Sequence, residues 1–216
     1  MKTVRILVAD DHEVVRKGVC SLLETHPGWT VVGEAITGRD AVKKAAKLKP
    51  DVVILDYSMP ELNGLEAIRQ ILKAAPQTEV LALTMYDSEQ VTRHVLAAGA
   101  RGYVLKSDAV RNLVAAVEAL CQHKPFLTSA VSEMVIRDFQ KSNRSEVSMP
   151  GDRLTQRERE IVQLLAEGKS NKEVASLLGI SIKTAETHRR NVLGKLNLHS
   201  ISDLVHYAIR NKIIEA

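Results

Sequence analysis

The chain has 216 residues, enough for one large domain or two of ordinary size, with 45% apolar residues but only 3% aromatic ones. It has no run of 18 apolar residues, which excludes a membrane-spanning helix, and its first residues lack the apolar stretch of an export signal. We therefore expect a cytoplasmic protein with no membrane partner. The net charge of +4 is uneven, because residues 150–216 hold 11 Lys and Arg against 8 Asp and Glu, which favours an anionic partner for that part.

Residues 1–124 alternate between short apolar runs, typical of buried strands, and longer segments with apolar residues at helical spacing. Strands are predicted at residues 4–9, 30–35, 52–55, 80–83 and 102–105. Helices are predicted at residues 12–25, 38–48, 65–74, 88–98 and 108–122. Five such units predict an α/β fold, a flavodoxin-like doubly wound five-stranded parallel sheet of order 2-1-3-4-5 with helices on both faces. Cys20 and Cys121 fall in the helices, where we expect buried free thiols.

Polar side chains stand where several of these strands end. In open parallel sheets that edge is where ligands bind, and the predicted strand order places strands one, three, four and five side by side. We therefore expect three carboxylates, a hydroxyl and an ammonium to converge on one pocket. These side chains are Asp10 and Asp11 after strand one, Asp56 after strand three, Thr84 after strand four and Lys106 after strand five.

This set of groups indicates phosphoryl transfer. Clustered carboxylates repel one another unless a cation joins them, and hard oxygen ligands suit Mg²⁺. Such a cation neutralises charge while Asp56 accepts a phosphoryl group, and Lys106 offers a second positive charge to a phosphoryl oxygen. The Thr84 hydroxyl can donate to another phosphoryl oxygen only once the group has arrived, so it is a natural sensor. A nucleotide or flavin site is the alternative for this fold, but it needs a Gly-rich loop where this chain has Asp10 and Asp11.

The ordered combination of Asp10-Asp11, Asp56 with Met59-Pro60 and Gly64 after it, Thr84 and Lys106 resembles the receiver domain of two-component response regulators. The resemblance covers the whole of residues 1–124. It implies an aspartyl phosphoacceptor, a Mg²⁺ site, a switch hydroxyl with a phosphate-binding ammonium, and a switch aromatic residue whose ring moves inward.

By that resemblance each role falls on a named residue. Asp56 is the phosphoacceptor; Asp10, Asp11, Asp56 and the backbone carbonyl of Ser58 hold Mg²⁺; Thr84 and Lys106 bind the phosphoryl group; and Tyr103 is the switch aromatic residue. An ordinary tyrosine on the last strand remains the alternative for Tyr103. Met85 departs from the family pattern, which often has a small residue after the switch hydroxyl, so phosphoryl lifetime and access of the phosphodonor stay open.

Residues 125–152 are interpreted as a linker. Pro125 stops the preceding helix, and Thr128 or Ser129 can cap a further helix that reaches Phe139. The polar residues after it end in a Pro-Gly pair, as domain linkers often do. An ordered arm packed on one of the domains is the alternative.

Residues 153–216 have the pattern of a small helical domain. A capping box at Thr155 and Glu158 begins the first helix, Ser170 caps a helix at residues 171–178, and Ser181 caps one at residues 182–196, predicted to be buried through Ile182 among others. A fourth helix follows Ser200. Two helices joined by a three-residue turn with Gly179 form a helix-turn-helix, whose second helix enters the DNA major groove.

The exposed side of residues 182–196 carries side chains that suit phosphates and base edges. The segments around residues 154–160, 171–175 and 181–188 resemble the LuxR-type helix-turn-helix, and with a receiver in front the chain resembles the NarL/FixJ class of response regulators. The predicted DNA-facing residues are Lys183, Thr184, Glu186, Thr187, Arg190, Asn191 and Lys195. The resemblance also makes the last helix a dimer contact.

The hypothesis is a phosphorylation-dependent, DNA-binding transcriptional regulator. A sensor histidine kinase phosphorylates Asp56, which shifts the receiver, and the chain then binds a promoter as a homodimer, on an inverted repeat. The receiver promotes its own phosphotransfer and dephosphorylation but is not a turnover enzyme. Two alternatives remain: a DNA-binding protein whose receiver is only a protein-binding or ligand-sensing scaffold, and a hydrolase of small phosphoesters, which lacks a second catalytic acid beside Asp56.

Overall fold

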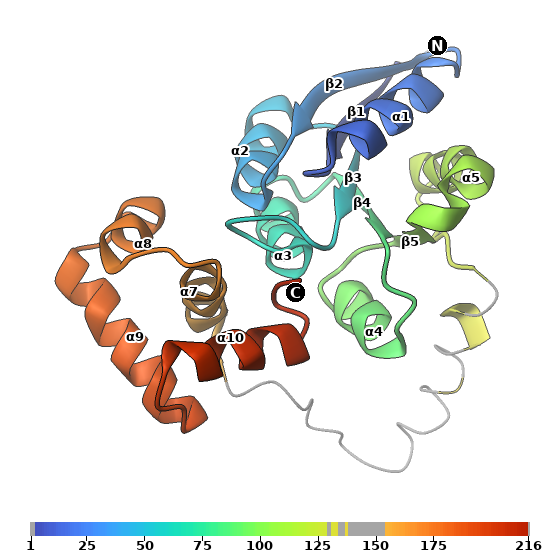
Figure 1. Ribbon diagram of the computed structural model, residues 1–216. Helices are drawn as coiled ribbons and strands as arrows, with labels where there is room; N and C mark the ends of the chain where they lie inside the picture. Colours follow the sequence, from blue (N-terminus) through green and yellow to red (C-terminus); the bar gives the residue numbers. More distant parts are fainter. Residues whose placement is uncertain (1–2, 129–130, 134–136, 138–153, 216) are drawn as a thin grey trace. The chain divides into compact units, whose positions relative to one another are not determined.

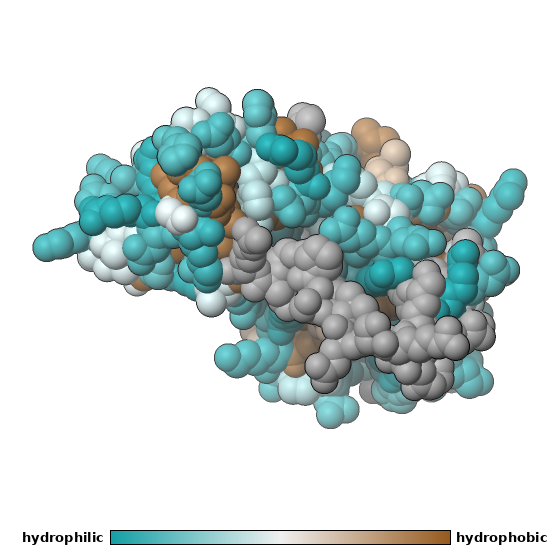
Figure 2. Space-filling view, turned by 90° about the horizontal axis from the view of Figure 1, so that it is seen from below, coloured by the Kyte–Doolittle hydropathy of each residue, from teal (hydrophilic) through white to brown (hydrophobic). Residues whose placement is uncertain are grey.

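The computed structural model describes residues 3–128, 131–133, 137 and 154–215 (Figure 1). These residues form two compact units, one built from β1 to α5 and the other from α7 to α10. Within the described ranges, no helix is both long enough and apolar enough to cross a membrane. Among the described residues, hydrophilic side chains predominate on the face drawn in Figure 2, with smaller hydrophobic patches between them.

The first unit is a five-stranded parallel sheet of order β2-β1-β3-β4-β5, which confirms the predicted fold class and strand order. Its strands are β1 (Val4–Ala9), β2 (Trp29–Ala35), β3 (Val52–Asp56), β4 (Glu79–Thr84) and β5 (Gly102–Leu105). Its helices are α1 (Glu13–Glu24), α2 (Gly38–Leu48), α3 (Gly64–Ala74), α4 (Glu89–Ala97) and α5 (Ala109–Cys121), with the 3₁₀ turn η1 (Lys106–Asp108) before α5.

The sheet is covered on both faces. Helix α1 lies beside α5, α2 lies beside α3, and α3 lies beside α4 (Figure 1). Alternate residues such as Ile6 and Val8 of β1 join Leu23 of α1 and Leu113 of α5 in one apolar core. Every residue of β3 is buried, because this central strand has neighbours on both edges and helices on both faces. Its last residue, Asp56, is thereby fixed at the carboxyl edge.

The prediction for the two thiols was half right. Cys20 is buried and free, but Cys121 is exposed. The buried stripe of α5 runs through Leu113, Val117 and Leu120. Cys121 follows Leu120 by one residue, about 100° further round the helix, so its side chain lies outside that buried stripe.

The second unit consists, in its described part, of α7 (Gln156–Ala166), α8 (Asn171–Leu178), α9 (Ile182–Leu196) and α10 (Ile201–Arg210). The predicted capping box is present: Glu158 donates its backbone N–H to Thr155 Oγ1 at 3.3 Å and accepts the Thr155 N–H at 2.6 Å. Gly179 ends α8 with φ of 63°, a left-handed conformation that favours glycine, and so turns the chain into α9. This is the predicted helix-turn-helix connection.

One core residue of this unit was predicted wrongly. Ile182 is 47% exposed, whereas Ala185 and Val192 of the same helix are buried. The packed part of α9 begins at Ala185, so the first turn of the helix projects beyond the core. Of the helix predicted between the two units, residues 131–133 and 137 are helical, and the remainder lies outside the described residues.

Candidate functional sites

Two buried carboxylates share one ammonium at the carboxyl edge of the sheet. Asp10 follows β1 and is 1% exposed, and Asp56 ends β3 and is 2% exposed. Lys106, which follows β5, places Nζ 2.8 Å from Asp10 Oδ2 and 2.8 Å from Asp56 Oδ2. The structure therefore brings together three of the side chains that the sequence pattern predicted would converge.

A third carboxylate and an imidazole stand beside this pair. Asp11 is exposed, and its Oδ1 lies 2.9 Å from Nδ1 of His12. One potential ligand atom from each of Asp10, Asp11, His12 and Asp56 can be chosen so that all lie within 4.8 Å of one another. His12 is a residue that the sequence analysis did not identify. Its position next to the Asp10-Asp11 pair was the signal that could have found it.

The charge balance of the pocket favours a cation. Burial raises the pKa of Asp56 from 3.8 to about 6, although the ammonium of Lys106 opposes this. Burial would lower the pKa of Lys106, but the carboxylates of Asp56 and Asp10 outweigh it and raise the pKa above its usual value. Three carboxylates face one ammonium, so net negative charge remains and hard oxygen donors are available. This donor set suits a divalent cation.

The backbone around the acids is supported by specific contacts. Arg16, which is buried, donates from its guanidinium to the Asp10 carbonyl at 2.8 Å and is itself held by Glu34 at 3.0 Å. A Cβ at Gly64 would lie 2.5 Å from the carbonyl oxygen of Asp56, so only glycine allows the start of α3 to approach β3 so closely. These contacts hold the acidic residues at the edge of the sheet.

Ser58 lies in the loop after β3. Its backbone N–H bonds to the Asp56 carboxylate, which favours the ionised form, and its hydroxyl donates to the Tyr86 hydroxyl at 3.4 Å. Met85, the departure noted in the sequence, is 70% exposed and so lies on the surface next to Thr84.

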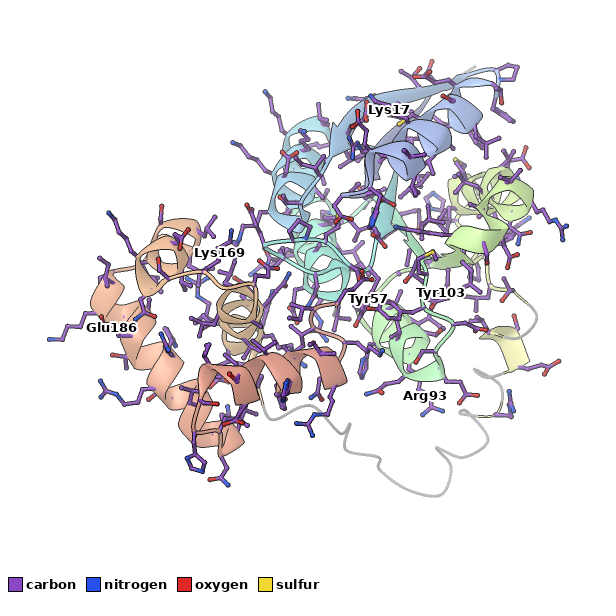
Figure 3. All side chains as sticks on the ribbon, viewed as in Figure 1. Lys17, Tyr57, Arg93, Tyr103, Lys169 and Glu186 are labelled. Carbon is purple, nitrogen blue, oxygen red and sulfur yellow. The ribbon has the colours of Figure 1, made fainter. Side chains whose placement is uncertain are left out.

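A chain of hydrogen bonds joins Thr84 to Tyr103 through Tyr86. The backbone N–H of Tyr86 donates to Thr84 Oγ1 at 3.1 Å, and the Tyr103 hydroxyl donates to the Tyr86 carbonyl at 2.5 Å. Tyr103, on β5 in Figure 3, is 2% exposed, so its ring already points inward. Burial raises its pKa and keeps the hydroxyl protonated as a donor. Tyr86 was missed because nothing in its spacing distinguishes it from a loop residue.

The predicted DNA-facing residues all lie exposed on α9, where Figure 3 marks Glu186. Three of their side chains make local bonds. The Thr184 hydroxyl bonds to the Ser181 hydroxyl at 2.8 Å, and the Thr187 hydroxyl donates to the Lys183 carbonyl at 2.9 Å. Lys195 Nζ lies 2.8 Å from Glu158 of the α7 capping box. An open hollow of about 360 Å³ adjoins this surface. It is lined by Asn171, Glu186, Arg189, Arg190 and Leu193, and of these Asn171, Arg189 and Leu193 are not among the predicted DNA-facing residues.

These two sites define a class of protein. A parallel sheet with a buried carboxylate, a shared lysine and a buried hydroxyl at its carboxyl edge is built to accept a phosphoryl group. A helix-turn-helix with an exposed, partly basic second helix is built to bind DNA. The chain thus combines a phosphoryl-accepting domain with a DNA-binding domain.

Comparison with known proteins identifies the family. Residues 6–118 match the response regulator receiver domain, and residues 152–208 match the bacterial regulatory proteins of the luxR family. The oxygen regulatory protein NreC of Staphylococcus epidermidis is 39% identical over 98% of this chain and 100% of its own length. The transcriptional regulatory protein LiaR of Bacillus subtilis is 37% identical over 98% of this chain and 99% of its own.

Solved structures agree with this result. The RcsB response regulator of Salmonella typhimurium is 30% identical, with a TM-score of 0.58 over 96% of this chain and 98% of that one. RcsB has also been solved as two dimers bound to two parallel DNAs, at 29% identity and a TM-score of 0.59 over 95% of this chain and 98% of that one. The chain belongs to the NarL/FixJ-type response regulators and is a phosphorylation-dependent, DNA-binding transcription regulator.

Proposed function

We propose that Asp56 is the phosphoacceptor and that Mg²⁺, held by Asp10, Asp11, Asp56 and the backbone carbonyl of Ser58, supports the transfer. The observation that carries this proposal is the position of Lys106, whose ammonium lies 2.8 Å from both buried carboxylates. An ammonium held there can move from Asp56 to a phosphoryl oxygen without leaving the pocket, because Asp10 continues to bind it. When bound, the cation would neutralise charge on the carboxylates and on the incoming phosphoryl oxygens.

The chemistry follows from the ionised carboxylate. With a pKa of about 6, Asp56 is mainly a carboxylate at pH 7 and can act as the nucleophile. Its oxygen attacks the phosphorus of a phosphohistidine on a sensor kinase. A P–O bond forms as the P–N bond breaks, and the imidazole leaves with the electron pair and takes a proton from water. Lys106 then binds the new phosphoryl group. In the later dephosphorylation, water attacks the phosphorus, the bond from phosphorus to the Asp56 oxygen breaks, and inorganic phosphate and the Asp56 carboxylate are released. The chain promotes both steps without being a turnover enzyme.

Thr84, Tyr86 and Tyr103 would carry the signal away from Asp56. When the Thr84 hydroxyl turns to donate to a phosphoryl oxygen, its bond to the Tyr86 backbone changes. Tyr86 also accepts the Tyr103 hydroxyl, so the loop after β4 and the buried ring of Tyr103 respond together. This gives the receiver two discrete arrangements, which phosphorylation can bias.

The second unit would read DNA through α9. The proposed boundaries are residues 1–124 for the receiver, 125–152 for the linker and 153–216 for the DNA-binding domain. Lys183, Thr184, Glu186, Thr187, Arg190 and Asn191 are the proposed contacts, with Lys195 shared between DNA phosphate and Glu158. The relative RcsB binds DNA as dimers. A homodimer joined through α10 would likewise place two copies of α9 on an inverted repeat. We also propose a cytoplasmic location, because the promoter DNA is in the cytoplasm.

The test is acetyl-phosphate-driven DNA binding by the full chain and by Asp56→Asn. We expect the wild type to show a retarded band on a phosphate-binding gel and tighter promoter binding, both dependent on Mg²⁺. Asp51→Asn is the matched control, since Asp51 lies immediately before the same strand, at its other end from Asp56, and its carboxylate accepts the Arg5 N–H at 2.9 Å. Stimulation of DNA binding that survives in Asp56→Asn would leave the receiver as a scaffold only.

A further inference from the structure

The imidazole of His12 lies beside the carboxylates of the acidic pocket. Nδ1 of His12 is 2.9 Å from Asp11 Oδ1 and 3.5 Å from Asp10 Oδ1, and it belongs to the group whose ligand atoms lie within 4.8 Å of one another. Two donors that occupy adjacent positions around a metal ion at about 2.1 Å are about 3 Å apart. The His12 nitrogen therefore already has this separation from Asp11 Oδ1 and lies about half an ångström further from Asp10 Oδ1.

The two oxygens of Asp10 face different partners. Oδ2 lies against Lys106, while Oδ1 accepts the backbone N–H of His12 at 2.9 Å and lies near its ring. An ion on the Oδ1 side can thus be bound by Asp10, Asp11 and His12 while Lys106 keeps its place. The His12 side chain is 59% exposed, and as the N-cap of α1 it makes no side-chain capping bond, so its position is not required for the helix.

We propose that His12 is a nitrogen ligand that makes this pocket selective for divalent transition metals such as Mn²⁺ and Co²⁺ over Mg²⁺. Imidazole suits transition metals, whereas Mg²⁺ takes oxygen ligands and retains water. The inference rests on the proposed function, because it assumes that the cation of phosphoryl transfer binds at Asp10, Asp11 and Asp56. It adds a residue that sets which cation that pocket prefers.

The experiment uses the full chain and Mn²⁺ as the probe, followed by pulsed electron paramagnetic resonance. We expect ¹⁴N modulation from a directly bound imidazole in the wild type. The signal should vanish in His12→Gln, while Mn²⁺ still binds, and should persist in His206→Gln, in which an exposed histidine of α10 is changed. Competition titrations should show Co²⁺ affinity falling at least about tenfold in His12→Gln and Mg²⁺ affinity changing less than about twofold.

The Asp10→Asn variant distinguishes a failure of the cation site from a failure of the role of His12. If Mn²⁺ binding is unaffected by Asp10→Asn, the pocket is not the cation site, and the Mg²⁺ site in the proposed function is wrong. If Asp10→Asn abolishes binding but His12→Gln keeps the ¹⁴N signal and the Co²⁺ to Mg²⁺ preference, the role of His12 is overturned and the acidic site stands.

Discussion

Replacing Asp56 by Asn should stabilise the receiver in the absence of a divalent cation. In the folded chain the pKa of this carboxyl is about 6 instead of 3.8, because burial disfavours its charged form. At about 1.36 kcal/mol per pH unit, this difference means that the ionised carboxylate costs about 3 kcal/mol of folding free energy at pH 7. Asn has the same shape without the charge, and Lys106 keeps its ion pair with Asp10.

The sign of the pH dependence follows from the raised pKa. The folded chain binds the proton more tightly than the unfolded chain does, so this group favours folding fully below about pH 4. That contribution is lost as the pH rises through about 6. The advantage of Asp56→Asn over the wild type should therefore be about 3 kcal/mol at pH 7 and close to zero at pH 4.

The assay is urea unfolding followed by tryptophan fluorescence, with a chelator present. Trp29 is the single tryptophan of the chain, lies on β2 and stacks on His26 with ring centroids 3.9 Å apart, so it reports the receiver. A gain of about 3 kcal/mol moves the urea midpoint up by on the order of 1–2 M. Asp51→Asn controls for the loss of a negative charge from the same unit and should not raise the midpoint. A midpoint for Asp56→Asn at or below the wild-type value at pH 7, or an advantage that persists at pH 4, would refute the reasoning.

Three further predictions concern the same two units. Lys106→Met removes the ammonium shared by two buried carboxylates. We expect the free energy of unfolding of the cation-free receiver to fall by about 3 kcal/mol in the same fluorescence assay. An unchanged urea midpoint would show that the two ion pairs do not stabilise the fold. Gly64→Ala places a Cβ 2.5 Å from a backbone oxygen and should lower the free energy of unfolding by about 2 kcal/mol. Gly18→Ala, the control, meets nothing within 4 Å and should be neutral or stabilising. Equal urea midpoints for the two variants would show that the backbone near Gly64 can move apart at little energetic cost. Arg190→Ala should weaken promoter binding and lower the slope of log affinity against log salt by about 1, and a slope equal to that of the wild type would remove Arg190 from the phosphate contacts.

The order of elements was accessible from the sequence because it depends on local periodicity. Apolar runs such as residues 52–55 can be satisfied only by burial on both faces, and helical spacing with Ser or Thr caps marks where helices begin. Parallel strands expose their carboxyl ends at one edge, so the sequence alone predicts that Asp10, Asp56 and Lys106 meet there. The capping box at Thr155 and Glu158 was predictable for the same reason, since its partners are three residues apart.

Contacts between loops and between side chains of different elements were decided only by the tertiary structure. Periodicity says which face of α9 is apolar, but not that its packed part begins at Ala185 and leaves Ile182 exposed. It also says nothing of the bond between Lys195 and Glu158, 37 residues apart. The hydrogen bonds from Thr84 through Tyr86 to Tyr103 likewise depend on how the loop after β4 packs against β5. Such contacts follow from packing in three dimensions, whereas the elements themselves follow from the alternation of apolar and polar residues along the chain.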